Sequence, residues 1–153
     1  MGIYHNINKE CISWKKAEKK IVFTNGCFDL LHQGHKDLLK TSLNFGDILI
    51  VGLNSDISVK ILKGKDRPIQ SEKIRKKNLI ETNAVSRVYI FDDPTPIELI
   101  KIISPDILVK GGDYKLDQVV GAEDVLAYGG EVKIVPLTPG YSTTNQIKKI
   151  KRQ

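Results

Sequence analysis

Two histidines near the start of a helical stretch are the part of the sequence best suited to chemistry. His32 and His35 lie three residues apart, with Gly34 between them. At this spacing two side chains share one face of a helix, and the free N–H groups at a helix start attract phosphate. The segment therefore predicts a phosphate site. The alternative is that both histidines only cap the helix and pack against it.

The residues before the histidines do not form either of two common phosphate motifs. Residues 24–35 read Thr-Asn-Gly-Cys-Phe-Asp-Leu-Leu-His-Gln-Gly-His. The Gly-Lys-Ser/Thr of a Walker A loop is missing, and so are the three spaced glycines of a dinucleotide-binding fingerprint. Gly26 instead predicts a turn in which the backbone can approach a ligand closely.

Short apolar runs alternate with helical stretches along the chain, which predicts the elements that position these residues. Strands rich in Val and Ile are expected at 21–23, 47–53, 87–91, 106–109 and 132–135. Helices are expected at 7–14, 35–43, 71–83, 96–103 and 122–128, with a last one from about residue 144. Strands without polar alternation are typical of a parallel sheet covered on both faces. We therefore expect an α/β, doubly wound, Rossmann-like five-stranded parallel sheet with helices on both faces.

Length and composition favour one domain. The chain has 153 residues, of which 41% are hydrophobic and 27% charged, as in an ordinary folded domain. Residues 1–19 are expected to form a helical extension and residues 20–150 the core. No apolar run is long enough to span a bilayer, and the first residues fit neither a signal peptide nor a myristoylation site. A cytoplasmic location without a membrane partner is therefore expected. Two cysteines are too few for a disulfide framework or a zinc cage.

The net charge of +6 suits small anionic ligands better than nucleic acid. The basic residues are spread along the chain, except for four near its end. No aromatic residue interrupts that basic run, as a base-stacking surface would require. We expect no nucleic-acid partner and interpret the run as a solvated helix face. Its members are Lys148, Lys149, Lys151 and Arg152.

Two further segments bring polar groups to the same edge of the predicted sheet as Gly26. Residues Lys110–Asp113 follow the fourth strand, where bare backbone and one cation suit a nucleotide base. Residues Ser142–Thr144 start the last predicted helix, so hydroxyls and free N–H groups point toward one place. The alternatives are an ordinary strand-to-helix turn for the first segment and a simple helix N-cap for the second.

A polar segment before the helix at 71–83 supplies further cations. Lys63, Lys65 and Arg67 lie there, and Arg75 lies on the helix itself. Loops of this kind can close over anions, and arginine can bind phosphate with two parallel hydrogen bonds. The alternative interpretation is that each lysine belongs to an ordinary solvated loop.

The segment Gly26–His35 resembles the signature of the cytidylyltransferase-like nucleotidyltransferases. This family joins a nucleoside triphosphate to a phosphorylated small molecule and releases pyrophosphate. Residues 21–150 resemble in particular the adenylyltransferase domain of bacterial bifunctional heptose enzymes, which makes ADP-heptose from heptose 1-phosphate. Four further stretches support the resemblance: Phe23–Asp29, Leu62–Gly64 with Arg67–Pro68, Leu108–Tyr114, and Ser142–Thr144.

The resemblance implies roles for individual residues. It implies catalytic roles for His32, His35 and Arg75, and sugar-phosphate contacts from Lys63 and Arg67. Nucleotide contacts are implied for Asn25, Gly26, Cys27, Phe28, His32, His35, Lys110, Gly111, Asp113, Ser142, Thr143 and Thr144.

The resemblance also implies a cofactor and partners. Mg²⁺ is the expected cofactor, with its protein ligands unassigned. Asp29 and Asp56 are candidate ligands, although Asp29 more often anchors such a turn, and Mg²⁺ leans mainly on waters and substrate phosphates. ATP and a sugar phosphate are the expected substrates, within a homodimer. A sugar kinase on a separate polypeptide is expected to act upstream.

The implied reaction is a direct transfer, in which a sugar-phosphate oxygen attacks the α-phosphorus of ATP in line. That oxygen is already ionised near neutral pH, so no general base is needed. One alternative enzyme is a cytidylyltransferase for glycerol or alditol phosphate, or an adenylyltransferase for a flavin or pantetheine precursor. Leu137 stands where related cytidylyltransferases have an arginine, which argues against the cytidylyltransferase. The other alternative is a non-catalytic module that binds adenylates.

Overall fold

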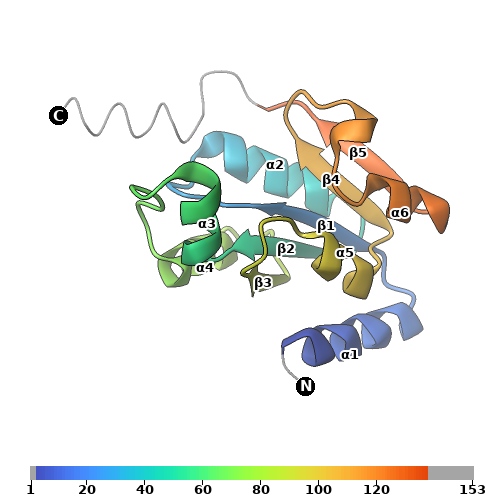
Figure 1. The fold of residues 1–153 in the computed structure, drawn as a ribbon. Helices are drawn as coiled ribbons and strands as arrows, with labels where there is room; N and C mark the ends of the chain where they lie inside the picture. The colour runs from blue at the N-terminus through green and yellow to red at the C-terminus, as the bar shows by residue number, and fades with distance from the viewer. Residues whose placement is uncertain (1–2, 138–153) are drawn as a thin grey trace.

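Five parallel strands form one sheet within residues 3–137, the part of the chain that the computed structural model describes (Figure 1). They are β1 (Ile21–Gly26), β2 (Ile48–Asn54), β3 (Arg87–Phe91), β4 (Ile107–Gly111) and β5 (Glu131–Val135). Their order across the sheet is β3-β2-β1-β4-β5. The chain therefore builds outward on one side of β1 and then crosses to the other side. Such a reversal leaves a crevice at the carboxyl ends of the strands, where ligands of open parallel sheets bind.

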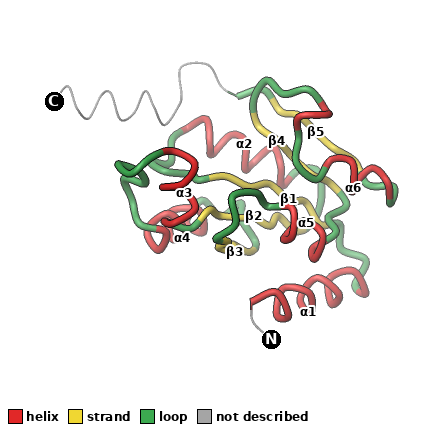
Figure 2. Tube along the Cα trace, in the orientation of Figure 1, coloured by secondary structure: helices red, strands yellow, loops and turns green. Residues whose placement is uncertain are grey.

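Helices cover both faces of this sheet (Figure 2). Those in the described residues are α1 (Ile3–Lys16), α2 (Gln33–Leu43), α3 (Asp56–Lys63), α4 (Glu72–Glu81), α5 (Ile97–Ile103) and α6 (Ala122–Ala127), with a 3₁₀ turn at Leu116–Gln118. The predicted doubly wound, Rossmann-like α/β fold is confirmed. None of these helices has the length and apolar character that crossing a bilayer would require.

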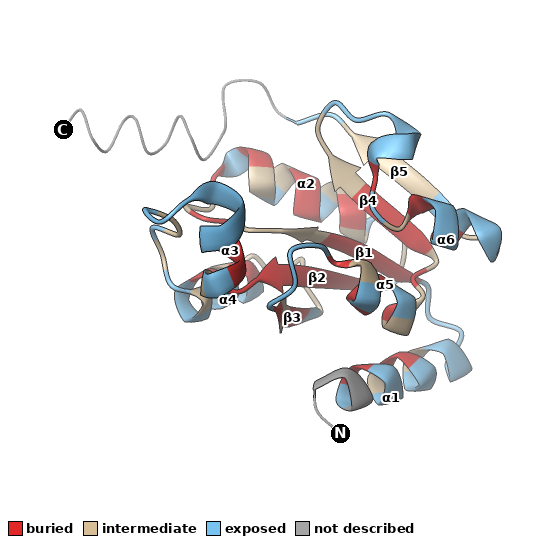
Figure 3. Cartoon of the chain, in the orientation of Figure 1, coloured by how far each residue is buried: buried red, intermediate tan, exposed pale blue. Residues whose placement is uncertain are grey.

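Successive residues of each strand face two different apolar cores. In β1, Ile21 and Phe23 pack with α1, α5 and α6, whereas Val22 packs with α2 and α4. This alternation follows from the two-residue period of a strand. Since both faces are covered, the central strands β1, β2 and β4 are mostly buried (Figure 3). Burial on both faces is the reason that these strands show no polar alternation in the sequence.

The predicted strands are confirmed, as are the predicted helices at 7–14, 35–43, 71–83, 96–103 and 122–128, with ends shifted by up to four residues. The predicted helices do not include α3. Its N-cap, Ser55, accepts a hydrogen bond from the Ser58 N–H at 3.1 Å. Ile57 and Ile61 follow the helical spacing of four residues but point outward, and the helix is only 8 residues long, which is short for recognition by periodicity. The helix expected from about residue 144 and the basic run near the chain end lie outside the described residues.

Helix α1 closes the β3 edge of the sheet. Its Ile7 and Cys11 are buried in the core that α5 also covers, and burial raises the pKa of the Cys11 thiol to about 11. The Glu10 carboxylate accepts hydrogen bonds from the Tyr89 hydroxyl at 2.8 Å and from Arg87 Nε at 2.7 Å. These contacts attach α1 to the edge strand β3.

Candidate functional site

A cavity of ≈ 550 Å³ opens at the carboxyl ends of the strands, where the strand order reverses. The predicted site residues that line it are Asn25, Gly26, Cys27, Phe28, His32, His35, Lys63, Arg67 and Lys110. The cations among the described lining residues are Lys63, Arg67 and Lys110, and no carboxylate joins them. The cavity therefore presents a positive surface to an anionic ligand.

Some lining residues were not expected from the sequence. They are Asn54, Leu62, Pro94, Thr95, Pro96, Val120 and Leu137. Asn54 ends β2, and residues 94–96 follow β3 by two residues. Their position directly after a strand is the signal that could have identified them, because the carboxyl ends of parallel strands meet at one edge of a sheet.

The turn after β1 is shaped by close packing and by left-handed backbone. A Cβ atom on Gly26 would lie 3.0 Å from the ring of Phe28, so the backbone approaches closely only without a side chain. Phe28 and Leu30 have φ angles of +47° and +57°, a region in which side chains other than glycine are strained. The Phe28 ring in turn meets the edge of His35, with ring centroids 5.3 Å apart. The surrounding contacts must therefore hold this turn in place.

His32 and His35 cap α2 by binding each other's backbone. The His35 N–H donates to Nδ1 of His32 at 3.4 Å, and the His32 N–H donates to Nδ1 of His35 at 3.3 Å. The two rings stack with centroids 3.7 Å apart. The rings therefore cap the helix and also line the cavity, and the phosphate site stays a prediction.

The capping bonds determine the chemistry that the two imidazoles can offer. Because each Nδ1 accepts a hydrogen bond, the proton of each neutral ring is on Nε2. Burial, together with a smaller effect of the neighbouring His32, lowers the pKa of His35 to about 4. Burial also lowers the pKa of His32. At neutral pH the pair therefore supplies two neutral N–H donors rather than two positive charges.

Asp29 fixes the loop that follows α3. Its fully buried carboxylate accepts hydrogen bonds from the Ile69 N–H at 2.7 Å, the Gln70 N–H at 2.9 Å and Arg67 Nε at 3.1 Å. The Asp29 carboxylate, in the turn after β1, thereby holds a loop that lies about forty residues further along the chain. The loop presents Arg67 to the cavity with part of its guanidinium already bound.

The two candidate Mg²⁺ ligands already have protein partners. Asp29 is held by the three donors above, and Asp56 accepts from Arg75 Nη2 at 2.9 Å and the Glu72 N–H at 2.8 Å. Among the side chains that the structure describes, no three His, Cys, Asp or Glu residues gather closely enough to bind a metal ion. The donor chemistry of the described residues therefore does not fit a cation held by the protein itself.

Arg75 lies behind the cavity and does not line it. Its side chain is 0% exposed, and its guanidinium donates to carbonyl groups of the protein and to Asp56. The structure therefore does not bring Arg75 together with His32 and His35 on the ligand side, as the catalytic role implied by the resemblance would require.

The segment after β4 contributes to the cavity through its first residue. The Lys110 ammonium lies in the cavity wall, 4.8 Å from the ring centroid of Tyr114. Gly111 packs under this wall, where an added Cβ would lie 2.8 Å from Leu38. Asp113 is exposed and does not line the cavity. The predicted residues Ser142, Thr143 and Thr144 lie outside the described residues.

Cys27 lines the cavity without the character of a nucleophile. Burial raises the pKa of its thiol, and the nearby charges of Lys63, Arg75 and Arg67 only partly oppose this. A thiol with a raised pKa stays protonated at neutral pH and reacts slowly. Cys27 therefore contributes its backbone and a small side chain to the site.

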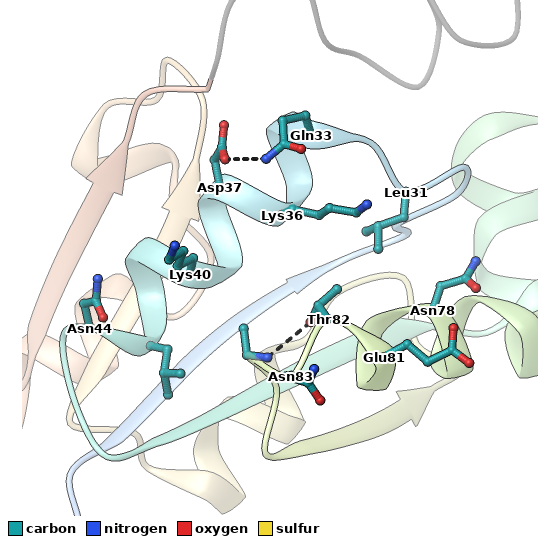
Figure 4. A pocket seen from close by; sticks show the side chains of 12 residues that line it. Leu31, Gln33, Lys36, Asp37, Lys40, Asn44, Asn78, Glu81, Thr82 and Asn83 are labelled. Atoms are coloured by element: carbon teal, nitrogen blue, oxygen red, sulfur yellow. Dashed lines mark hydrogen bonds between the residues drawn. The ribbon is translucent and has the colours of Figure 1, made fainter.

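A larger open groove of ≈ 920 Å³ lies between α2 and the end of α4 (Figure 4). Lys36 and Lys40 line it together with Asp37 and Glu81, so the charges balance. The groove contains no predicted site residue and lies away from the carboxyl ends of the strands. Size alone therefore does not make it the functional site, and the smaller positive cavity is the stronger candidate.

The arrangement is suited to a nucleotide with several phosphates. Neutral Nε2–H donors, three cations and the backbone of a left-handed turn surround a single cavity. Such preorganised donors stabilise negative charge that develops during phosphoryl transfer.

Comparison with known proteins shows which family this chain resembles. Residues 23–149 match the family described as cytidylyltransferase-like. The bifunctional protein HldE of Koribacter versatilis (strain Ellin345) is 54% identical over 136 residues, which are 89% of this chain and 28% of that protein. The bifunctional protein HldE of Geotalea uraniireducens (strain Rf4) is 52% identical over 137 residues, which are 90% of this chain and 28% of that protein. The chain thus spans less than a third of the length of these relatives.

A solved structure also resembles this chain. The lipopolysaccharide core biosynthesis protein from Thermoplasma volcanium GSS1 is 32% identical, with a TM-score of 0.63. The similarity covers 78% of this chain and 97% of that one.

The lowered pKa of His35 predicts an acid-sensitive stability. Between its ordinary pKa of 6.5 and about 4, the unfolded chain binds a proton that the folded chain does not, so the free energy of unfolding falls as pH falls through this window. The His35→Gln variant should lose this contribution. Urea unfolding at pH 7, 6 and 5 should give a steeper fall for the wild type, by up to about 1.4 kcal/mol per pH unit. Equal slopes for the two proteins would show that His35 titrates normally.

Proposed function

We propose a function from one established premise: the chain belongs to the cytidylyltransferase-like family of nucleotidyltransferases. The proposed reaction transfers AMP from ATP to a sugar 1-phosphate and releases pyrophosphate. The proposed acceptor is D-glycero-D-manno-heptose 1-phosphate, which gives ADP-heptose. The observation that carries the proposal is the His32–His35 pair, which caps α2 inside the positive cavity. About 50% identity to the HldE proteins supports the choice of substrate.

The mechanism follows from the groups in the cavity. An oxygen of the sugar phosphate attacks the α-phosphorus of ATP, and the bond from that phosphorus to the bridging oxygen of the β-phosphate breaks as pyrophosphate leaves. The attacking oxygen is already ionised, so the protein removes no proton. Nε2–H of His32 and of His35 donate hydrogen bonds to phosphate oxygens, and Lys63, Arg67 and Lys110 balance the charge.

Magnesium is proposed as part of the substrate. Asp29 and Asp56 are engaged by protein donors, so we propose that Mg²⁺ arrives bound to the phosphates of ATP. A sugar kinase is proposed to act upstream, because the reaction consumes a sugar 1-phosphate.

The donor nucleotide and the acceptor can be tested together. Each of ATP, CTP, GTP and UTP is combined with heptose 1-phosphate, glycerol 3-phosphate and hexose 1-phosphates, and pyrophosphate release is measured. ATP with heptose 1-phosphate should give the highest kcat/KM. A tenfold preference for CTP would refute the adenylyltransferase and favour the cytidylyltransferase. If no pair releases pyrophosphate, the chain is a binding module.

A substitution can test the imidazoles as hydrogen-bond donors separately from their role in capping α2. Asparagine is itself a good N-cap, so His32→Asn should keep α2 capped while removing the Nε2–H donor. We expect kcat to fall about 10²- to 10³-fold, as for a lost donor to developing charge, with a melting temperature near that of the wild type. His35→Gln should behave in the same way, because glutamine at the third helical position can accept the His32 N–H in a capping box. A kcat within about threefold of the wild type, with the fold intact, would leave the histidines as caps only.

The homodimer is proposed on a separate observation, the outward face of α3. Ile57 and Ile61 are each 65% exposed and lie one helical turn apart. An antiparallel contact with α3 of a second copy would place Ile57 and Ile61 of one copy against those of the other. The two apolar stripes would then cover each other.

Sedimentation velocity tests this contact. The wild type should sediment as a species of twice 17.2 kDa, and Ile61→Glu should shift it to the monomer. Ile12→Glu on α1, at a residue 46% exposed, serves as the control and should leave the dimer intact. A monomeric wild type, or equal effects of both substitutions, would exclude the α3 interface.

A further inference from the structure

Arg75 is a buried cation with no direct part in the proposed transfer. It is 0% exposed and heads the largest side chains that are fully buried. Burial of a charged guanidinium is costly unless it is paired and its donors are satisfied. The partners of this buried cation, which lies behind the cavity, therefore indicate its role.

The hydrogen bonds of Arg75 connect four segments at the rim of the cavity. Nη1 donates to the carbonyl oxygens of Cys27 at 2.8 Å and Asn54 at 2.7 Å. These carbonyls lie at the ends of β1 and β2. Nε donates to the carbonyl oxygen of Gln70 at 3.0 Å, in the loop before α4. Nη2 donates to Asp56, the first residue of α3, at 2.9 Å. The planar fork of arginine can reach all of these acceptors, whereas the single ammonium of a lysine cannot.

Asp56 neutralises Arg75 and joins two helix starts. The Glu72 N–H donates to its carboxylate at 2.8 Å, and the Asp56 N–H donates to the Glu72 carboxylate at 3.0 Å. This reciprocal pair fixes the start of α3 against the start of α4. Since Lys63 lies at the other end of α3, the arrangement also determines where this cation enters the cavity.

The hydrogen bond from Arg75 to the Cys27 carbonyl sets the direction of the Cys27–Phe28 peptide group in the turn after β1. In a trans peptide the C=O and the following N–H point in opposite directions. The Cys27 carbonyl points inward to Arg75, so the N–H of Phe28 points away from Arg75. Cys27 and Phe28 both line the cavity. The Phe28 N–H is thereby directed toward the ligand side.

We propose that Arg75 is a positioning residue, which acts through the Cys27–Phe28 peptide and holds the Phe28 N–H as a donor for a phosphate group of the nucleotide. The inference rests on the proposed function, because it names one contact of the same site. It places Arg75 behind the turn, whereas a catalytic arginine would touch the substrate. The positive charge of Arg75 also acts on the turn, because it lowers the pKa of the Cys27 thiol and so partly opposes the effect of burial.

The test compares ligands with and without phosphates on Arg75→Lys, which keeps the charge and loses the fork. ATP and adenosine are titrated into ¹⁵N-labelled full-length protein, without any sugar phosphate. In the wild type, ATP should move the Phe28 amide proton downfield. In Arg75→Lys this shift should be lost and ATP affinity should fall about tenfold or more, as for a lost hydrogen bond to a charged group. Adenosine affinity should stay within about twofold.

Controls separate positioning from a general loss of structure. Lys76→Met, at the exposed neighbouring position of α4, should match the wild type with both ligands. If Arg75→Lys binds ATP as the wild type does, or loses ATP and adenosine equally, the proposal is wrong. Should Arg75→Lys fail to fold, Asp56→Asn should show a smaller loss for ATP alone, and an unchanged ATP affinity would overturn the proposal. A wild type that binds no ATP would instead refute the proposed function.

Discussion

Two buried charged side chains, Asp29 and Arg75, hold the turn between β1 and α2 in a backbone conformation that its own residues disfavour. Phe28 and Leu30 both have positive φ angles, so the turn needs support from outside. Asp29 binds the N–H groups of the loop at residues 69–70, and Arg75 binds the Cys27 carbonyl. The backbone conformation of the turn is therefore stabilised by two charged side chains, Asp29 and Arg75, that do not face the ligand.

The charges around the cavity are divided between two kinds of group. His32 and His35 stack closely, so two positive rings would repel each other, and their capping bonds keep each Nδ1 unprotonated. They therefore act as oriented neutral donors. The positive charge comes from residues on three other segments, at Lys63, Arg67 and Lys110. Oriented neutral donors thus lie beside separate cations, an arrangement that suits a reaction that depends on positioning and charge stabilisation.

The topology explains why such distant segments meet. The strand order reverses next to β1, so the ends of β1, β2 and β4 and the loop after α3 all open on one side of the sheet. The buried sheet provides a rigid base, and α1 covers its far edge through Glu10 and two buried residues. The loops at the carboxyl edge gather the polar and cationic groups that line the candidate site.

The sequence alone determined the sheet, most helices and the core of the site. These depend on local patterns, namely Val- and Ile-rich runs, helical spacing, and a histidine pair directly before a helix. The rule that parallel strands present ligands at their carboxyl ends then brought Gly26, His32 and Lys110 together. Helix α3 was not predicted because a segment of 8 residues is too short for its apolar period to be distinctive.

Only the tertiary structure decided the role of Arg75 and the partners of Asp29. A sequence shows that a cation stands on a helix, but the direction of its side chain depends on how α4 packs through Leu79 against β2 and β3. Likewise, the bonds from Asp29 to Ile69 and Gln70 join residues about forty positions apart. No local period encodes such pairings. They arise because buried charges must find partners among whichever groups the folded chain places beside them.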